Sequence, residues 1–249
     1  MLRLIQEYCP TLPAQGMAME EALFETASND GLDTIRFWIN NRCVIIGRSQ
    51  AAWSEVDRDR AEALGIPVIR RLSGGGAVYH YPGNLNISLF LSEGASLGTV
   101  DESFRAFGGA LAGSLSTLGL QILSDRGSLL RGERKIGGAA QMRRGNCLLY
   151  HTTLLVEPDS LDMKDLLLAM RPGYAPSATR SLPVETATLR EIRCFDLPKP
   201  SSIAQLMLQG ISAVLHRPIR EGKPSFQEEE KAERLASQKY SDPQWNLYR

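Results

Sequence analysis

The sequence has few of the residues that would indicate a disulfide-linked or metal-bound fold. It contains 4 cysteines in 249 residues, at positions 9, 43, 147 and 194, and 3 histidines that do not cluster. This spacing offers neither a disulfide framework nor a paired zinc motif, and it is typical of a reduced, cytoplasmic chain. No apolar run approaches the roughly 18 residues that a membrane helix requires. The first residues hold a glutamate and two prolines where a signal peptide would have its apolar core. We therefore expect neither export nor a membrane anchor.

Neither sign of charge dominates, because 28 Lys and Arg residues balance 28 Asp and Glu residues. A neutral chain is not expected to have nucleic acid as its main partner. One segment is an exception, since residues 126–144 hold six basic residues against a single glutamate.

Helix and strand patterns alternate along the chain without a repeat or a clear linker, which predicts one α/β domain over residues 1–249. We expect Ser54 to begin a helix that ends at Gly65, Asp101 to cap a helix through Leu118, and a short helix over 160–170. The alternation in 84–91 predicts a strand with one apolar face. Residues 171–188 are expected to form a long loop, and residues 220–249 a C-terminal helical tail.

The stretch RRLSGGGAVYH, residues 70–80, places three consecutive glycines after an apolar strand. Glycine loses more backbone freedom on folding than other residues do, about 0.5–1 kcal/mol relative to alanine. Either the bare N–H groups approach an anion, such as a phosphate or a carboxylate, or the run is a structural bulge. The pattern fits neither a P-loop nor a dinucleotide fingerprint.

Neighbouring basic residues favour an anion site. Arg70 and Arg71 precede the glycines, and strand alternation directs one of them to the glycine face, while the other is expected to be solvated. A guanidinium can hold a phosphate through two parallel hydrogen bonds. Lys135 precedes IGGAA, small residues that again permit a ligand near the backbone, although a lysine after a turn is more often a solvated charge.

With these residues in view, the chain resembles the lipoate-protein ligase A family, within the larger group of biotin ligases, lipoate ligases and octanoyltransferases. RRLSGGGAVYHYPGNLN resembles the family's triple-glycine block, RKIGGAAQ its lysine block and HTTLL the strand that follows. MAMEEALF, VIIGRSQ and KYSDPQWN resemble further blocks, all in the family's order. The resemblance implies an α/β (α+β) fold with a mixed, largely antiparallel central sheet flanked by helices.

The resemblance also implies a reaction. Lipoate or octanoate reacts with ATP to give an acyl-adenylate, and the acyl group is then transferred to a lysine of a lipoyl-domain protein. Because a carboxylate attacks a phosphate, cations and N–H donors must offset the repulsion. Lys135 is expected to be the catalytic residue, and Mg2+ is expected beside the phosphates without an assignable ligand. The expected ATP- and lipoate-binding residues are Arg71, Ser73, Gly74, Gly75, Gly76, Ala77, Val78, Tyr79, Asn84, Lys135 and Thr153.

Four positions depart from the family pattern, namely Ala51, Tyr81, Gly137 and Thr152, and KIGG is closer to the lysine block of biotin ligases. These departures leave the acyl substrate open. The acceptors implied are the acyltransferase subunits of 2-oxoacid dehydrogenases and the glycine cleavage H protein. Because many bacterial ligases append an accessory domain that this chain does not contain, we expect a separate small accessory subunit.

Three alternatives remain. An octanoyltransferase of the same fold would need a thiolate activated by nearby positive charge; Cys147 is the candidate, although the strand pattern around it is more typical of a buried residue. A biotin-protein ligase is disfavoured because its arginine-glycine repeat loop is missing. A non-catalytic binder that has kept the fold would hold nucleotide without forming an adenylate.

Overall fold

The computed structural model describes residues 1–193 and 196–248, so Cys194 lies outside the described residues. A sheet of eight strands forms the centre, in the order β11-β1-β2-β6-β10-β9-β8-β7. β1 is parallel to β2 and β11, and the other neighbouring pairs are antiparallel. The strands are β1 (Leu2–Thr11), β2 (Thr34–Asn40), β6 (Asn84–Leu91), β7 (Leu123–Asp125), β8 (Ser128–Arg131), β9 (Arg134–Arg144), β10 (Cys147–Leu155) and β11 (Ile219–Glu221). The predicted mixed, largely antiparallel sheet is confirmed.

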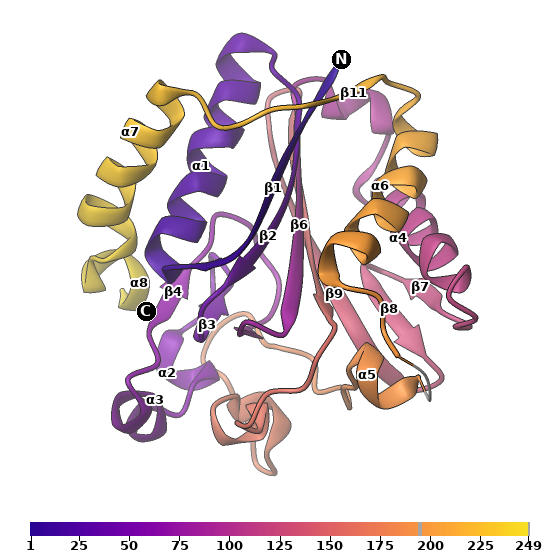
Figure 1. The fold of residues 1–249 in the computed structure, drawn as a ribbon. Helices are drawn as coiled ribbons and strands as arrows, with labels where there is room; N and C mark the ends of the chain where they lie inside the picture. Colours follow the sequence, from indigo (N-terminus) through magenta and orange to yellow (C-terminus); the bar gives the residue numbers. More distant parts are fainter. Residues whose placement is uncertain (194–195, 249) are drawn as a thin grey trace.

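Helices cover both faces of this sheet. Figure 1 shows α1 (Pro13–Asp30) and α7 (Phe226–Leu235) on one side, and α4 (Val100–Ser116) and α6 (Pro200–Leu215) on the other. The main core lies under α4 and α6, and Leu85, Ile87, Leu89 and Leu91 of β6 belong to it. Asn86 and Ser88 face the opposite side of β6, where they line a cavity. The alternation therefore predicted the strand correctly, and its polar face lines a cavity that the sequence did not predict there.

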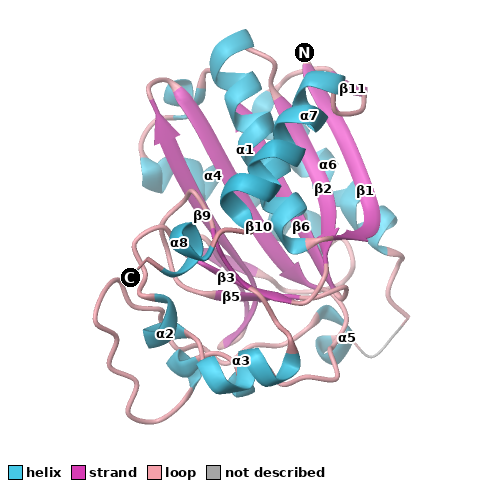
Figure 2. Cartoon of the chain, turned by 90° about the vertical axis from the view of Figure 1, so that its left-hand side faces the viewer, coloured by secondary structure: helices cyan, strands magenta, loops and turns pink. Residues whose placement is uncertain are grey.

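A second, smaller sheet lies across the lower end of the large one (Figure 2). It consists of β3 (Cys43–Ile46) between β4 (Val68–Arg70) and β5 (Val78–His80). The glycine run connects β4 to β5. Two short helices, α2 (Ala52–Glu55) and α3 (Arg58–Leu64), lie beside this sheet and separate β3 from β4 in the sequence.

Several helix boundaries differ from the predictions. Thr99 caps α4 instead of Asp101, because Thr99 and Glu102 form a reciprocal capping box. The helix expected to begin at Ser54 is interrupted, because Val56 is extended and pairs with Leu167, and α3 restarts with Asp57 as its cap.

The later part of the chain also differs in detail. Residues 160–170 form two 3-10 turns, η2 (Met163–Asp165) and η3 (Leu168–Met170), instead of one helix. The tail begins with a strand, β11, and its helix α7 packs against α1. The remaining elements are η1 (Gly94–Leu97), α5 (Leu189–Ile192), the π-helical turn η4 (Ala236–Tyr240) and α8 (Pro243–Leu247). No helix in the described part of the chain combines the length and apolar character needed to cross a membrane.

Candidate active site

Two adjoining cavities lie between the large sheet and the small one. The larger has a volume of about 300 Å³ and the smaller about 100 Å³. Both are lined by Lys135, Gly138, Thr153 and Ser181, so these residues mark the junction between them. A ligand with two dissimilar parts could therefore occupy both cavities, with its middle beside Lys135.

The glycine loop, residues 73–77, lines the larger cavity through Gly75, Gly76 and Ala77. Arg71 holds its carbonyl groups: Nη2 donates to Gly74 O at 2.6 Å and to Gly76 O at 2.8 Å. The backbone N–H groups of Gly74, Gly75 and Gly76 have no hydrogen-bond partner among the described residues. With carbonyls held and amides free, the loop can receive an anion.

At two of the three glycines, contacts with protein atoms explain why a side chain is not tolerated, without the need for a ligand. Gly75 has φ +90°, which disfavours any side chain, and an added Cβ would lie 2.9 Å from Nη2 of Arg71. At Gly76 a Cβ would lie 2.9 Å from Oγ of Ser181. At Gly74 a Cβ would meet nothing within 4 Å.

Both arginines that precede the loop are buried, with exposed fractions of 0% for Arg70 and 5% for Arg71. Arg70 donates to the carbonyl groups of Gly47, Gln50, Trp245 and Asn246 at 2.7–3.1 Å. It is therefore a structural link, and the prediction that one of the pair is solvated is wrong. Burial lowers the pKa of Arg71 to about 10, which leaves it cationic at neutral pH.

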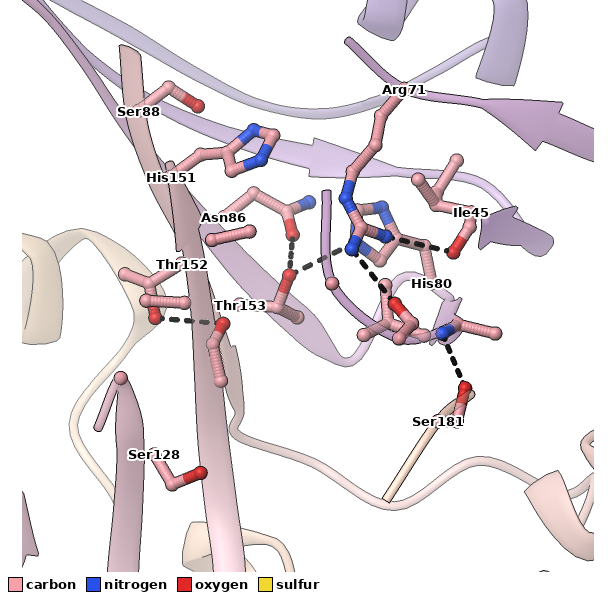
Figure 3. A pocket seen from close by; sticks show the side chains of 18 of the residues that line it. Ile45, Arg71, His80, Asn86, Ser88, Ser128, His151, Thr152, Thr153 and Ser181 are labelled. Atoms are coloured by element: carbon pink, nitrogen blue, oxygen red, sulfur yellow. Dashed lines mark hydrogen bonds between the residues drawn. The ribbon is translucent and has the colours of Figure 1, made fainter. Parts of the chain in front are cut away.

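A buried polar cluster fastens the 171–188 loop to the glycine loop. Ser181 Oγ accepts from the Ala77 amide at 2.8 Å and from Gln50 Nε2 at 3.1 Å, and it donates to Glu55 at 2.5 Å. Tyr174 donates to the same carboxylate. The long loop predicted at 171–188 is present, and its side chain at 181 closes the cavity wall (Figure 3).

Lys135 enters the site from β9. Its ammonium occupies the space that a side chain at position 138 would take, because a Cβ on Gly138 would lie 2.9 Å from Nζ. Burial, followed by the charge of Arg71, lowers the pKa of Lys135. Lys135 and the glycine loop, 60 residues apart in the sequence, therefore line the same cavity, as the sequence predicted.

Two rows of paired residues on the large sheet form the floor of the larger cavity. In the first row, Asn86 pairs with Trp38 on one side and Thr153 on the other, and Thr153 pairs with Gly138. In the second row, His151 pairs with Ser88 and Ala140. Met17, Ile45 and Val78 add apolar surface to the same cavity.

The acidic side chain of Glu20 is the one carboxylate lining the larger cavity among the described residues, and it is fully engaged. It accepts hydrogen bonds from Ser88 and from His151 Nδ1, the latter at 2.9 Å. His151 Nε2 lies 2.6 Å from Ser73 Oγ. Burial raises the pKa of Glu20, but the interactions with His151 and Ser88 outweigh it, and the net shift is downward.

His80 also lines the larger cavity, and its Nε2 lies 3.0 Å from Thr153 Oγ1. Burial lowers the pKa of His80 to about 3.

The lowered pKa of His80 predicts a pH-dependent stability. Between pH 6.5 and 3 the unfolded chain binds a proton that the folded chain does not. The free energy of unfolding should therefore fall with decreasing pH, by about 1.4 kcal/mol per pH unit from this group. In urea unfolding at pH 7, 5.5 and 4.5, the free energy of unfolding should depend less steeply on pH in His80→Gln than in the wild-type protein. An identical pH dependence in both proteins would contradict it.

Most of the predicted site residues line the two cavities. These are Arg71, Gly75, Gly76, Ala77, Val78, Tyr79, Lys135 and Thr153. Ser73, Gly74 and Asn84 line neither cavity. Asn84 Nδ2 donates to the Tyr79 carbonyl, Ser73 Oγ accepts from Arg71 Nε, and the Gly74 carbonyl accepts from Arg71 Nη2. Residues missed from the sequence include Asn86, whose buried Nδ2 has no partner among the described residues.

Comparison with known proteins agrees with this geometry. The model of the lipoyl protein ligase A/B catalytic domain matches residues 12–211. The chain belongs to this ligase family. Lipoate-protein ligase A subunit 1 of Thermoplasma acidophilum is 30% identical over 257 aligned residues, which cover 98% of this chain and 96% of that protein. The resemblance found in the sequence is confirmed, and the ligase is an enzyme.

Solved structures agree in fold along the whole chain. A lipoate protein ligase of T. acidophilum with bound lipoic acid has a TM-score of 0.81 and 30% identity, covering 99% of this ligase and 98% of that chain. A lipoate-protein ligase A bound with ATP has a TM-score of 0.79 and 29% identity, covering 98% of each chain.

Cys147 of this ligase is buried at the start of β10, where Sγ lies 3.5 Å from the Ser92 carbonyl. It lines neither cavity. This placement gives no support to an octanoyltransferase with Cys147 as its nucleophile.

The described residues do not build a protein site for Mg2+. No group of three or more His, Cys, Asp or Glu residues is arranged to hold a metal within the ranges 1–193 and 196–248, and Glu20 is already engaged. The expected ion therefore remains a prediction tied to the nucleotide phosphates.

Proposed function

We propose that this ligase activates lipoate or octanoate with ATP and transfers the acyl group to a lysine of a lipoyl domain. The observation that carries the proposal is the position of Lys135, which lines both cavities and shares the larger one with Gly75 and Gly76, whose amides are unpaired within the part of the chain that is described. The likeness to a ligase with bound lipoic acid and to a ligase bound with ATP supports it.

The two cavities suit the two substrates. The acyl chain fits the larger cavity, against Met17, Trp38 and Val78, with its carboxylate toward Lys135. We assign the adenosine to the smaller cavity, whose lining includes the apolar side chains of Leu155 and Met170. The α-phosphate then lies at the junction, where an ammonium and N–H donors can offset the charge that develops.

The reaction follows from this arrangement in two steps. A carboxylate oxygen attacks the α-phosphorus of ATP, the bond to the bridging oxygen breaks, and pyrophosphate leaves with the electron pair. The acceptor lysine, as a neutral amine, then attacks the acyl carbonyl, an amide forms, and AMP leaves while the amine gives up a proton to solvent. Lys135 is placed to stabilise the negative charge in both steps.

Radiolabelled pyrophosphate exchange into ATP tests the first step. We expect exchange with lipoate or octanoate and none with biotin, because the sequence lacks the arginine-glycine repeat loop of biotin ligases. Absence of exchange with all three acids, despite nucleotide binding, would indicate a non-catalytic binder instead.

A separate accessory subunit is part of the proposal. A lipoate ligase of T. acidophilum is described as bi-partite and was studied with its E2 lipoyl domain. We propose that this ligase acts in the same way in the cytoplasm, with 2-oxoacid dehydrogenase acyltransferase subunits and the glycine cleavage H protein as acceptors. Full transfer to a lipoyl domain by the isolated chain would contradict the need for a partner.

A further inference from the structure

The hydrogen bonds of Arg71 leave little capacity for a phosphate. Nε donates to Ser73 Oγ at 3.0 Å, Nη1 to the Ile45 carbonyl at 3.2 Å, and Nη2 to the carbonyls of Gly74 and Gly76. Each guanidinium nitrogen is therefore engaged. Only one N–H, on Nη1, has no acceptor within the described ranges, so a phosphate bound through two parallel hydrogen bonds would displace at least one of these contacts. Other cations are therefore better suited to the role expected of Arg71 from the sequence.

Two other arginines line the larger cavity. The side chains of Arg126 and Arg180 are exposed, and neither has a hydrogen-bond or ion-pair partner within the described part of the molecule. They come from different segments, one from the β7–β8 hairpin and one from the 171–188 loop. Apart from them, the cations that line this cavity are Arg71 and Lys135.

Arg126 adopts an unusual backbone conformation. It has φ +42° and is followed by Gly127 with φ +82°, and both form the two-residue turn between Asp125 and Ser128. Such turns favour asparagine or glycine at this position, and a left-handed arginine is strained. The turn is tied to β9 next to the site, because the Ala139 amide donates to the Gly127 carbonyl at 2.6 Å. A strained arginine held at a cavity mouth indicates a functional requirement for its side chain.

Arg180 is placed by its neighbour. Ser181 is anchored on both its backbone and its side chain, by Tyr174 at 2.8 Å and by Ala77 and Glu55. The backbone of Arg180 is therefore fixed beside the glycine loop, while the guanidinium remains exposed. Figure 3 shows Ser128 and Ser181, near neighbours of the two arginines, in the lower part of the view, away from Ser88 and His151 in the upper part.

We propose that Arg126 and Arg180 bind the β- and γ-phosphates of ATP and stabilise the pyrophosphate as it leaves. The inference rests on the proposed adenylation. As the carboxylate bonds to the α-phosphorus, the electron pair of the breaking bond moves onto pyrophosphate, and the two guanidiniums meet that charge through paired hydrogen bonds. Their exposed position at the mouth also suits a group that must depart to solvent.

The test compares Arg126→Ala and Arg180→Ala with Arg131→Ala. Arg131 lies in the same hairpin and carries the same charge but lines neither cavity. We expect kcat/KM for ATP in pyrophosphate exchange to fall about 10- to 100-fold in the first two variants, with KM for the acid unchanged. Transfer from synthetic octanoyl-adenylate to a lipoyl domain, assayed with the accessory subunit present, should stay within about threefold, which also shows that each variant is folded.

Calorimetric titration with inorganic pyrophosphate separates this inference from the proposed function. Weakened binding in Arg126→Ala and Arg180→Ala, but not in Arg131→Ala, supports the inference even if the wild-type protein adenylates none of the acids. Exchange and pyrophosphate binding equal to those of Arg131→Ala would overturn it. A defect confined to transfer from octanoyl-adenylate would also overturn it, because the arginines would then serve the acceptor domain.

Discussion

Replacing Lys135 by methionine is expected to slow adenylate formation about 10²- to 10³-fold, the loss seen when one donor aimed at developing charge is removed. The ammonium has no hydrogen-bonded side-chain partner among the residues described, so its removal leaves no protein group unpaired. Stability should therefore be retained. The measurement is pyrophosphate exchange with saturating octanoate, and Lys223→Met, at an exposed position away from both cavities, is the matched control. Exchange in Lys135→Met equal to that of the control would remove the central role of this residue.

The same residue should set the alkaline limit of activity. Because its pKa is lowered below the ordinary lysine value of 10.5, the ammonium is lost at a lower pH than that of a solvated lysine. Adenylation should accordingly decline as pH rises through this lowered pKa. In Lys135→Met, the residual rate of adenylation should not show this decline as the pH rises.

Gly75→Ala is expected to have the second large effect. The added methyl group would be held at φ +90° and would press on the Arg71 guanidinium, so we expect a loss of about 1–3 kcal/mol in the free energy of unfolding. ATP affinity should fall at least about tenfold, because Arg71 no longer fixes the loop carbonyls. Gly74→Ala is the matched comparison for stability, since its methyl group meets open space. Equal losses of stability in the two variants would show that the conformation of Gly75 is not the cause.

The sequence predicted the parts of the site that depend on local pattern. Three consecutive glycines and a lysine before small residues each have a short-range signature, and the structure places Gly75, Gly76 and Lys135 around one cavity. The role of Arg71 could not be predicted in this way. Strand alternation shows that an arginine faces the glycines, but it does not show whether the guanidinium meets a ligand or the loop's own carbonyls.

Long-range contacts account for most of what was missed. Ser181 reaches Gln50 across 131 residues and Glu55 across 126 residues, and nothing in the sequence of the 171–188 loop marks this contact. Arg70 has the spacing of a surface strand residue, yet two of its acceptors lie about 175 residues away. Arg126 carried a signal in principle, since an arginine before glycine in a two-residue turn is unusual.

The arrangement around Arg70 bears on how the molecule acquires its shape. Its guanidinium joins the loop after β3 to Trp245 and Asn246, near the end of the described chain. The pairing of β1 with β11 likewise joins two segments that are far apart in the sequence. Pairings so distant in sequence have a high entropic cost until the remainder of the polypeptide is ordered. The glycine loop is thus expected to reach its final conformation late in refolding, after the core under α4 and α6 has formed. Enzyme activity should therefore recover more slowly than secondary structure does.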